Sequence, residues 1–379
     1  MALKTNSIWI ALCCICNIAC TSVNEHYDDI EVIDVENAQV RSFQIQHSEN
    51  GIKAIVLETS NECLIGDVAK IACNDEYIFV FDKSTHRILQ FDINGNFQRV
   101  ICQQGRSPQE MVEIKNMVLE GNYLYVHGLV RKILKFDING DEVQIITMPN
   151  GAILDFYPAT EASFWGHMYS DNSGSRDFYL TLLDSTLTVK GQWQRKNPNS
   201  IDINYGERYF FKNGQNQLFY YHHTTDDVCR LDNANVTPLY RFDFGDKTPD
   251  YEKISKVAST VDIRKELLGK YCIEGVMFVG DFLVFAYQEI KPSGETSIMQ
   301  YGAYDTQLNK TYLSEEGLSS LPFYIHKATK NGVVVYQVLY PANLDESAFD
   351  RLQIICRQQL SVENNPIILI DTITHFTVQ

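Results

Sequence analysis

The sequence predicts an all-β fold, a six-bladed β-propeller with one helical insertion. Nearly the same stretch occurs twice, as HRILQFDINGN at 86–96 and RKILKFDINGD at 131–141, 45 positions apart. Runs such as YIFVF at 77–81 are apolar at every position, which is typical of a sheet covered on both faces. The 21 Tyr and 20 Phe residues also favour strands.

Each repeat reads as strand, loop, strand, tight turn and strand. Asn94-Gly95 and Asn139-Gly140 predict type I′ hairpin turns, because both residue types tolerate positive φ. The aspartates that end the strand before the turn are separated by 45, 47, 48 and 73 residues: Asp92, Asp137, Asp184, Asp232 and Asp305. A period near 45 with about four strands per unit is the signature of a propeller. A sixth apolar run at 333–338 gives six blades, and a non-closing β-sandwich or two smaller β domains are the alternative.

The step of 73 residues contains an insertion over 248–271. Within it, Ile254, Val257, Ala258 and Val261 follow the i, i+3, i+4, i+7 spacing of an amphipathic helix. This helix, placed at 251–268, is either a lid over one mouth or a surface brace. We expect the ring to close where a strand at 52–57 meets one at 366–372.

The N-terminus predicts a lipoprotein signal peptide over residues 1–19. Lys4 precedes an apolar run at 8–16, which is too short to span a bilayer. Ala19 lies directly before Cys20, the expected lipidation site, although Asn17 stands where an aliphatic residue is usual. An ordinary cleaved signal peptide is the alternative. Residues 20–50 then form a tether and leading segment, and 51–379 the propeller, so we expect an outer-membrane lipoprotein of the cell envelope, periplasmic or surface-exposed.

The net charge of the chain limits the classes of partner that we expect, and the cysteine spacing bears on disulfides. The 32 Lys and Arg residues against 48 Asp and Glu give a net charge of −16, which argues against nucleic acid. The expected partners are the membrane, through the lipid anchor, and a glycan or envelope protein, with the chain itself a monomer. Six cysteines of the mature chain show no CxxC spacing, and we expect mostly buried free thiols, although export permits disulfides: Cys63, Cys73, Cys102, Cys229, Cys272 and Cys356.

Four stretches resemble a known family: ETSNECLIGDVAKI (58–71), YIFVFDKSTHRILQFDINGNF (77–97), QQGRSPQEM (103–111) and ENNPIILI (363–370). They are similar to the six-bladed β-propeller lipoproteins of gut anaerobes, relatives of NHL-repeat propellers. The third stretch usually reads GxGPGEY in that family. Here Gly105, Pro108 and Glu110 are retained, whereas Ser107, Gln109 and Met111 differ. The resemblance implies a fold and a location and leaves the activity open.

The sequence contains no GxSxG, P-loop, HExxH or Rossmann glycine motif. His127, His167 and His222 each end the first recognisable strand of their repeat, where Asp82 stands in the first unit. Three imidazoles at one propeller mouth are a possible zinc or calcium site, with His223 able to replace His222. The alternative is that these histidines simply end strands.

Further candidates at the ligand mouth are Arg106 and Glu110, which are either a charged pair facing the ligand or parts of a tight inter-blade turn. Aromatic residues near strand ends are candidates for a sugar-stacking platform, or else core residues between blades: Trp165, Tyr169, Tyr205, Tyr209, Tyr220, Tyr221 and Tyr287. The function expected is an exported, lipid-anchored module that binds a glycan, a peptide or a partner protein. The alternative is a metal-assisted lyase or hydrolase of NHL type.

Overall fold

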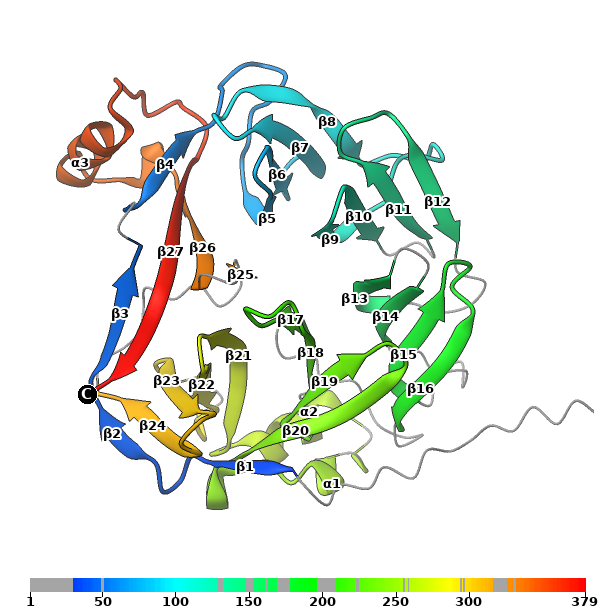
Figure 1. Cartoon of the computed structure of the whole chain (residues 1–379), viewed down its shortest axis with the longest axis vertical. Helices are drawn as coiled ribbons and strands as arrows, with labels where there is room; N and C mark the ends of the chain where they lie inside the picture. The colour runs from blue at the N-terminus through cyan, green and yellow to red at the C-terminus, as the bar shows by residue number, and fades with distance from the viewer. Residues whose placement is uncertain are drawn as a thin grey trace, which may run out of the picture.

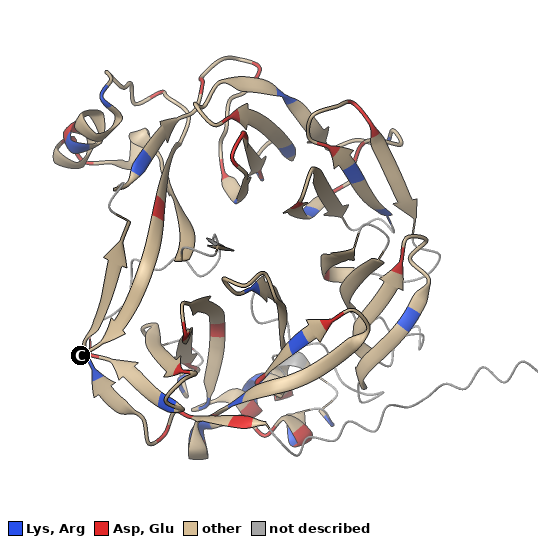
Figure 2. Cartoon of the chain, in the orientation of Figure 1, with Lys and Arg blue, Asp and Glu red and all other residues tan. Residues whose placement is uncertain are grey.

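The computed structural model shows a ring of six sheets around a central axis (Figure 1). It describes residues 30–48, 51–128, 132–147, 153–160, 163–168, 178–195, 209–222, 225–254, 256–257, 259–293, 295, 297–315, 326–329 and 332–379. The predicted six-bladed propeller is confirmed. No helix in these ranges is long and apolar enough to cross a membrane. Acidic and basic side chains are spread around the ring (Figure 2).

The first three blades are four-stranded antiparallel meanders. Blade 1 contains β5 (Val68–Cys73), β6 (Tyr77–Asp82), β7 (Arg87–Asp92) and β8 (Phe97–Gln103). Blade 2 contains β9 (Ile114–Glu120), β10 (Tyr123–Gly128), β11 (Lys132–Asp137) and β12 (Val143–Thr147). Blade 3 contains β13 (Ile153–Thr160), β14 (Ser163–Met168), β15 (Phe178–Asp184) and β16 (Val189–Arg195).

The last three blades each gain strands from the N-terminal segment. Blade 4 contains β17 (Phe210–Lys212), β18 (Leu218–His222), β19 (Asp227–Asp232) and β20 (Asn235–Asp243), with β1 (Glu31–Asp34) parallel to β20. Blade 5 contains β21 (Tyr271–Val279), β22 (Phe282–Glu289), β23 (Gln300–Asp305) and β24 (Lys310–Ser314), with β2 (Gln39–Arg41) parallel to β24. Blade 6 contains β25 (His326–Thr329), β26 (Gly332–Leu339) and β27 (Ile367–Val378), joined by β3 (Phe43–His47) and β4 (Lys53–Val56).

The ring closes through β27, which pairs antiparallel with both β4 and β3. Ile55 lies opposite Ile368, as expected for closure between 52–57 and 366–372. Asn365, just before β27, accepts a hydrogen bond from the backbone N–H of Ile65 and donates to the carbonyls of Glu58 and Cys63. This buried amide ties the chain leading into blade 1 to the last blade.

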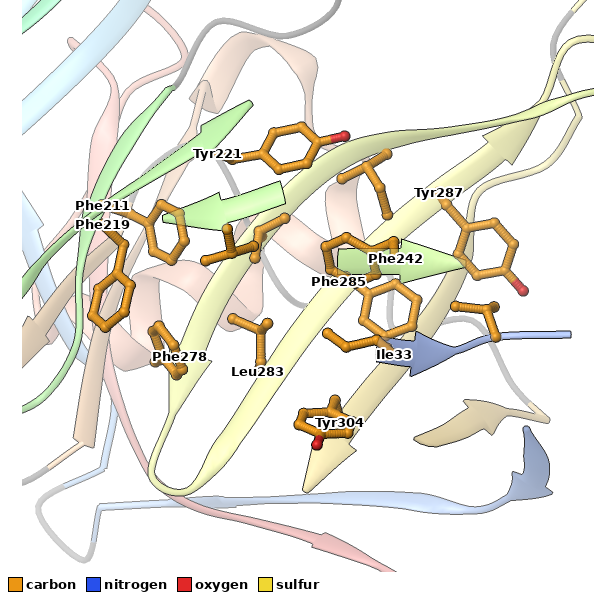
Figure 3. Close-up of a cluster of buried hydrophobic side chains, with 14 of the residues drawn as sticks. Ile33, Phe211, Phe219, Tyr221, Phe242, Phe278, Leu283, Phe285, Tyr287 and Tyr304 are labelled. Atoms are coloured by element: carbon orange, nitrogen blue, oxygen red, sulfur yellow. The ribbon is translucent and has the colours of Figure 1, made fainter. Parts of the chain in front are cut away.

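Apolar side chains fill the layers between neighbouring blades, which explains why the strands are apolar on both faces. Figure 3 shows one such layer, between blades 4 and 5. There the rings of Phe219 and Phe278 lie 4.7 Å apart, and those of Phe242 and Phe285 lie 4.9 Å apart. The six cysteines among the described residues are free thiols, and of these Cys356 is the one that is not fully buried.

The repeated turn differs from the type I′ geometry expected. Gly95 has φ of 91°, but Asn94 is not among the residues with positive φ. The Gly95 N–H donates to the Asp92 carbonyl, and the Asp92 carboxylate accepts from the backbone N–H groups of Asn94 and Asn96. The turn is therefore a four-residue turn over 92–95 whose last residue, Gly95, has positive φ, and the strand-ending Asp92 caps it.

The predicted helical insertion is present, but it forms three short pieces in place of one long helix: η1 (Gly245–Lys247), α1 (Tyr251–Ile254) and α2 (Thr260–Leu267). Ser259 begins α2 by accepting a hydrogen bond from the N–H of Asp262. Ile254 and Leu267 are buried, but Val261 is 64% exposed, so the predicted apolar face is partly wrong. Ala258 lies outside the described residues.

A second helical segment, not expected from the sequence, lies between β26 and β27. It consists of η2 (Pro341–Asn343) and α3 (Glu346–Cys356). Asp345 caps α3 by accepting from the N–H of Ala348. Leu352 faces inward and packs toward β4 and β27, so α3 covers the outside of blade 6 (Figure 1).

Candidate functional site

The three candidate histidines are buried inside the blade layers. His127, His167 and His222 are 4%, 1% and 2% exposed. The His127 ring packs on Phe156, with 5.6 Å between ring centroids, and its Nδ1 has no hydrogen-bond partner among the described residues. Burial lowers the pKa of His127 to about 4, so this imidazole is neutral at neutral pH.

His167 and His222 belong to an aromatic cluster between blades 3 and 4. The His167 ring stacks on Tyr209 at 3.8 Å between centroids, and its Nδ1 lies 2.7 Å from the Tyr220 hydroxyl. His222 meets Tyr179 edge-on at 4.9 Å, and its Nδ1 lies 2.8 Å from the Thr225 hydroxyl. These contacts hold blades 3 and 4 together. They therefore favour a structural role for both histidines.

The structure does not bring the three imidazoles together at a mouth. His127 lies in the layer between blades 2 and 3, and the other two lie between blades 3 and 4. Among the described residues, no group of three or more His, Cys, Asp or Glu side chains could hold a metal ion. The zinc or calcium site therefore does not form from these residues, and His223 lies outside them.

Asp82 is fully buried at the end of β6 and organises the loops beside it. Its carboxylate accepts hydrogen bonds from the N–H groups of Asp67 and Ser84 and from the hydroxyl of Thr85. Burial raises the pKa of Asp82, but these hydrogen bonds outweigh it and leave the pKa below its usual value. A carboxylate with so many internal donors is a loop anchor, not a ligand group.

Glu110 has a similar structural task in the loop between blades 1 and 2. It accepts from the backbone N–H of Ser107 and from the Gln103 side chain, each at 2.9 Å. Its carboxylate lies so close to Gly105 that any Cβ there would overlap it. The Arg106 side chain is exposed. Of the two interpretations of Arg106 and Glu110, these contacts favour parts of a tight inter-blade turn over a charged pair that faces a ligand.

The described members of the predicted aromatic platform are core residues, each less than 9% exposed: Trp165, Tyr209, Tyr220, Tyr221 and Tyr287. Tyr169 and Tyr205 lie outside the described residues. The aromatic candidates near strand ends therefore fill blade layers, although one of them, Trp165, also lines a surface groove.

A central channel of about 380 Å³ runs along the innermost strands β5, β9, β13 and β17. Three polar side chains cross it from blade to blade. Lys70 donates to the side-chain oxygen Oδ1 of Asn116, and the Asn116 side-chain NH₂ group donates to the Asp155 carboxylate. Asp155 also accepts from the backbone N–H of Tyr209, at 3.2 Å. We call this chain of contacts the polar belt; it links blades 1 to 4.

At the other end of the channel, a charged cluster spans blades 2, 3 and 4. The Lys212 ammonium donates to both carboxylate oxygens of Glu120, at 2.8 and 2.9 Å. The Tyr157 hydroxyl donates to the same carboxylate at 2.8 Å, and the Lys212 nitrogen lies 5.0 Å from the centre of the Tyr157 ring. Glu120, Tyr157 and Lys212 form what we call the mouth cluster.

The mouth cluster opens into a groove of about 700 Å³ on the surface. The three cluster residues line both the channel and the groove, so the two spaces meet there. The groove is built on the turns of blades 2, 3 and 4, and its polar and aromatic lining includes Asn122, Tyr123, Tyr125, Thr160, Trp165, Asn216, Gln217, Asp232 and Asn233.

The groove and the histidines lie at opposite ends of the blades. Glu120 pairs with Tyr123 beside the β9–β10 turn, whereas Asn116 pairs with His127 near the far end of the same two strands. None of the three histidines lines the channel or the groove. The placement of the ligand mouth at the histidine end stays a prediction from the sequence, whereas the groove lies at the turn end.

The polar belt and the mouth cluster were missed from the sequence, although a signal for the belt exists. Asn116 and Asp155 lie directly opposite His127 and His167 in the strand pairing. They therefore occupy equivalent positions of successive repeats, one strand closer to the axis. Reading the strand before each histidine would have found them.

A comparison with protein families matches residues 30–371 to DUF4934, a domain of unknown function. The chain belongs to the DUF4934 family. The match covers the N-terminal strands β1 to β4 and the blades up to Asp371, within β27 of blade 6. A search of curated proteins finds no match to this DUF4934 chain.

Solved structures agree on the fold of the DUF4934 chain. A Bacteroides fragilis NCTC 9343 protein, named as an exported protein, is 17% identical over 91% of this chain and 100% of its own, with a TM-score of 0.65. A DUF4221 member from Bacteroides vulgatus ATCC 8482 is 10% identical over 90% and 99%, with a TM-score of 0.53. Virginiamycin B lyase from Staphylococcus aureus, 10% identical over 87% and 99%, has a TM-score of 0.40, which carries no functional argument.

Proposed function

We propose that the DUF4934 chain is an exported, lipid-anchored binding module that takes its ligand at the turn end of blades 2, 3 and 4. The observation that carries the proposal is the mouth cluster, in which an ion pair between two blades stands where the channel meets a wide polar groove. Ligand sites are usually concave and present a few placed polar groups, and the mouth cluster has this form.

The lipid anchor rests on the sequence. Residues 1–19 read as a lipoprotein signal peptide with Cys20 next, and a structural neighbour is named as an exported protein. Replacing Cys20 with Ser should release the protein into the soluble envelope fraction, while the wild type partitions into detergent. Wild-type protein that carries no acyl groups by mass spectrometry would remove this part of the proposal.

Binding is supported by the electrostatics of the mouth. Side chains of Lys212 and Glu120 are 17% and 37% exposed, so the ion pair is partly desolvated and yet reachable. A partly buried polar cluster gives a ligand fixed donors and acceptors at little cost in ordering. The proposal assigns binding and no reaction.

The experiment is a screen of glycans, peptides and envelope extracts against the wild type and three variants. Lys212→Met removes the ammonium group, and Tyr157→Phe removes the hydroxyl but keeps the ring. A matched control is Lys247→Met, because Lys247 also pairs with a glutamate, Glu289, and lies over a tyrosine ring, but lines neither cavity.

We expect both mouth variants to weaken binding by about tenfold, the effect of losing one charge-assisted hydrogen bond, and the control to bind as the wild type does. A ligand that binds all four proteins equally would place the site elsewhere on the molecule.

A further inference from the structure

The charged residues around the groove favour a ligand without net charge. Three of the described groove-lining residues are charged: Glu120, Lys212 and Asp232. Lys212 is satisfied by both oxygens of Glu120, and Asp232 is paired with Arg230 at 2.7 Å. A ligand with a net charge would have to compete with these pairs, whereas a neutral ligand would not.

The groove also presents amide groups that no other described residue uses. Asn122, Asn216 and Asn233 are exposed, and their side chains make no hydrogen bond to any other residue that the structure describes. Each amide offers both donors and an acceptor. Several such groups around one concave surface match a ligand rich in hydroxyl groups, since a hydroxyl also donates and accepts.

Aromatic rings complete the lining. Tyr123 and Tyr157 are partly exposed, and Trp165 lies beneath at 1% exposure. Ring faces favour flat apolar surfaces such as the C–H face of a pyranose. A volume of about 700 Å³ lies within the range of small-ligand sites.

We propose that the groove binds an uncharged saccharide of a few units, held by the asparagine amides against the tyrosine rings. This inference rests on the proposed function and specifies its ligand class. The mouth cluster then acts as the polar end of the site: the Glu120 carboxylate accepts from a sugar hydroxyl, and the Lys212 ammonium donates to one.

The test uses defined probes and the purified protein from residue 20 to 379, which lacks only the predicted signal peptide. The neutral probes are gluco-, manno-, galacto- and xylo-configured trisaccharides, and the charged probes are the matching uronic acids and sugar phosphates. A neutral tripeptide is the control that is not a sugar. Binding is measured by calorimetry at about 50 and about 500 mM salt, because salt screens charged contacts and leaves neutral ones little changed.

The variants are chosen to preserve the backbone. Asn216 has φ of 64°, so Asn216→Gly removes the amide at a position that glycine tolerates. Asn122→Ala removes a second amide. Asn309→Gly is the control, because Asn309 also has positive φ, 53°, but lies in blade 5 outside the groove.

The expected result is saturable binding of at least one neutral saccharide, equal at both salt concentrations, and weakened about fivefold to tenfold by each groove variant, but not by Asn309→Gly. Binding of only charged probes or the tripeptide, lost in Lys212→Met, would overturn the saccharide inference and leave the proposed binding site standing. Neutral binding that is unchanged in both Asn216→Gly and Asn122→Ala also overturns the saccharide inference, and no binding by any probe overturns both this inference and the proposed function.

Discussion

The Tyr251 hydroxyl in the helical insertion donates a hydrogen bond to the buried carboxylate of Asp226 in blade 4, at 2.8 Å. Tyr221 donates to the other carboxylate oxygen at 2.6 Å. Burial raises the pKa of Asp226 to about 7, although both hydroxyls lower it; nearby Asp227 raises it further and Arg241 lowers it. A carboxyl group that titrates near neutrality therefore holds the insertion against the ring.

Asp226→Asn should remove a pH dependence of stability. The native carboxyl keeps its proton up to about pH 7, whereas the unfolded chain loses it near its usual pKa of 3.8. The free energy of unfolding therefore falls as the pH rises between these values. Asn resembles the protonated acid, so the variant should match the wild type at about pH 4 and exceed it by about 2–4 kcal/mol at about pH 8.

Urea denaturation at both pH values measures this difference. A second variant, Tyr251→Phe, removes a hydroxyl that lowers the pKa of Asp226. The pKa of Asp226 should therefore rise further in this variant, and its free energy of unfolding should keep falling to a higher pH than that of the wild type. A gap between Asp226→Asn and the wild type that stays the same at every pH would contradict the assignment.

His127→Phe should make the protein more resistant to acid. The pKa of His127 is lowered to about 4 by burial, so the native ring stays neutral where the unfolded ring is protonated. The neutral His127 ring therefore lowers the free energy of unfolding only below the unfolded pKa of about 6.5, and this loss grows as the pH falls toward 4. Phe should pack on Phe156 without titrating, giving an advantage of about 2 kcal/mol at about pH 4.5.

Thermal unfolding at about pH 7.5 and 4.5 tests this expectation. The exposed His375 provides a control, since His375→Gln should leave the difference between the two pH values unchanged. Equal acid sensitivity of His127→Phe and wild type would show that the buried ring is not responsible.

The two repeated turns should respond differently to the same substitution. Gly95 has φ of 91°, and a Cβ there would lie 2.3 Å from the Val56 carbonyl oxygen. Gly140 lacks positive φ, and its Cβ would meet nothing nearer than 3.6 Å. Gly95→Ala should therefore cost about 2 kcal/mol or more, and Gly140→Ala less than about 0.5 kcal/mol. Similar losses in both would mean that Gly95 does not press against β4.

Asn365→Ala should weaken the closure of the ring. The amide serves one donor and two carbonyl acceptors in a site that is 2% exposed, so its removal leaves buried backbone groups unpaired. We expect a loss of about 3 kcal/mol in denaturant unfolding. Asn364→Ala, one residue earlier and half-buried, should cost about 1 kcal/mol, and an equal effect of the two would contradict the role of Asn365.

The ring was predictable because its signal is local and repeated. Strands such as β6 and β10 are apolar over most of their length, and strand-ending aspartates such as Asp92 and Asp137 cap their own turns. β1, β2 and β3 were not predicted as outer strands, because they are short and mostly exposed and pair with blades more than 200 residues away. The α3 helix was missed since its exposed Ile354 and Ile355 blur the amphipathic pattern.

The candidate site was less predictable than the fold. Glu120 and Lys212 are common residue types 92 positions apart, and the ring brings them together across a third blade. The histidines stood out because imidazoles are rare, yet they serve as packing groups between blades. What the sequence supplies is the repeat register, from which equivalent residues on the innermost strands can be found.

The most direct test of the binding site is the affinity of the tightest neutral saccharide for the wild type, Lys212→Met and Lys247→Met. The account predicts a loss of about tenfold for Lys212→Met and no change for Lys247→Met. Equal affinities for all three proteins would contradict the proposed binding site, and no neutral saccharide that binds the wild type would contradict the saccharide inference.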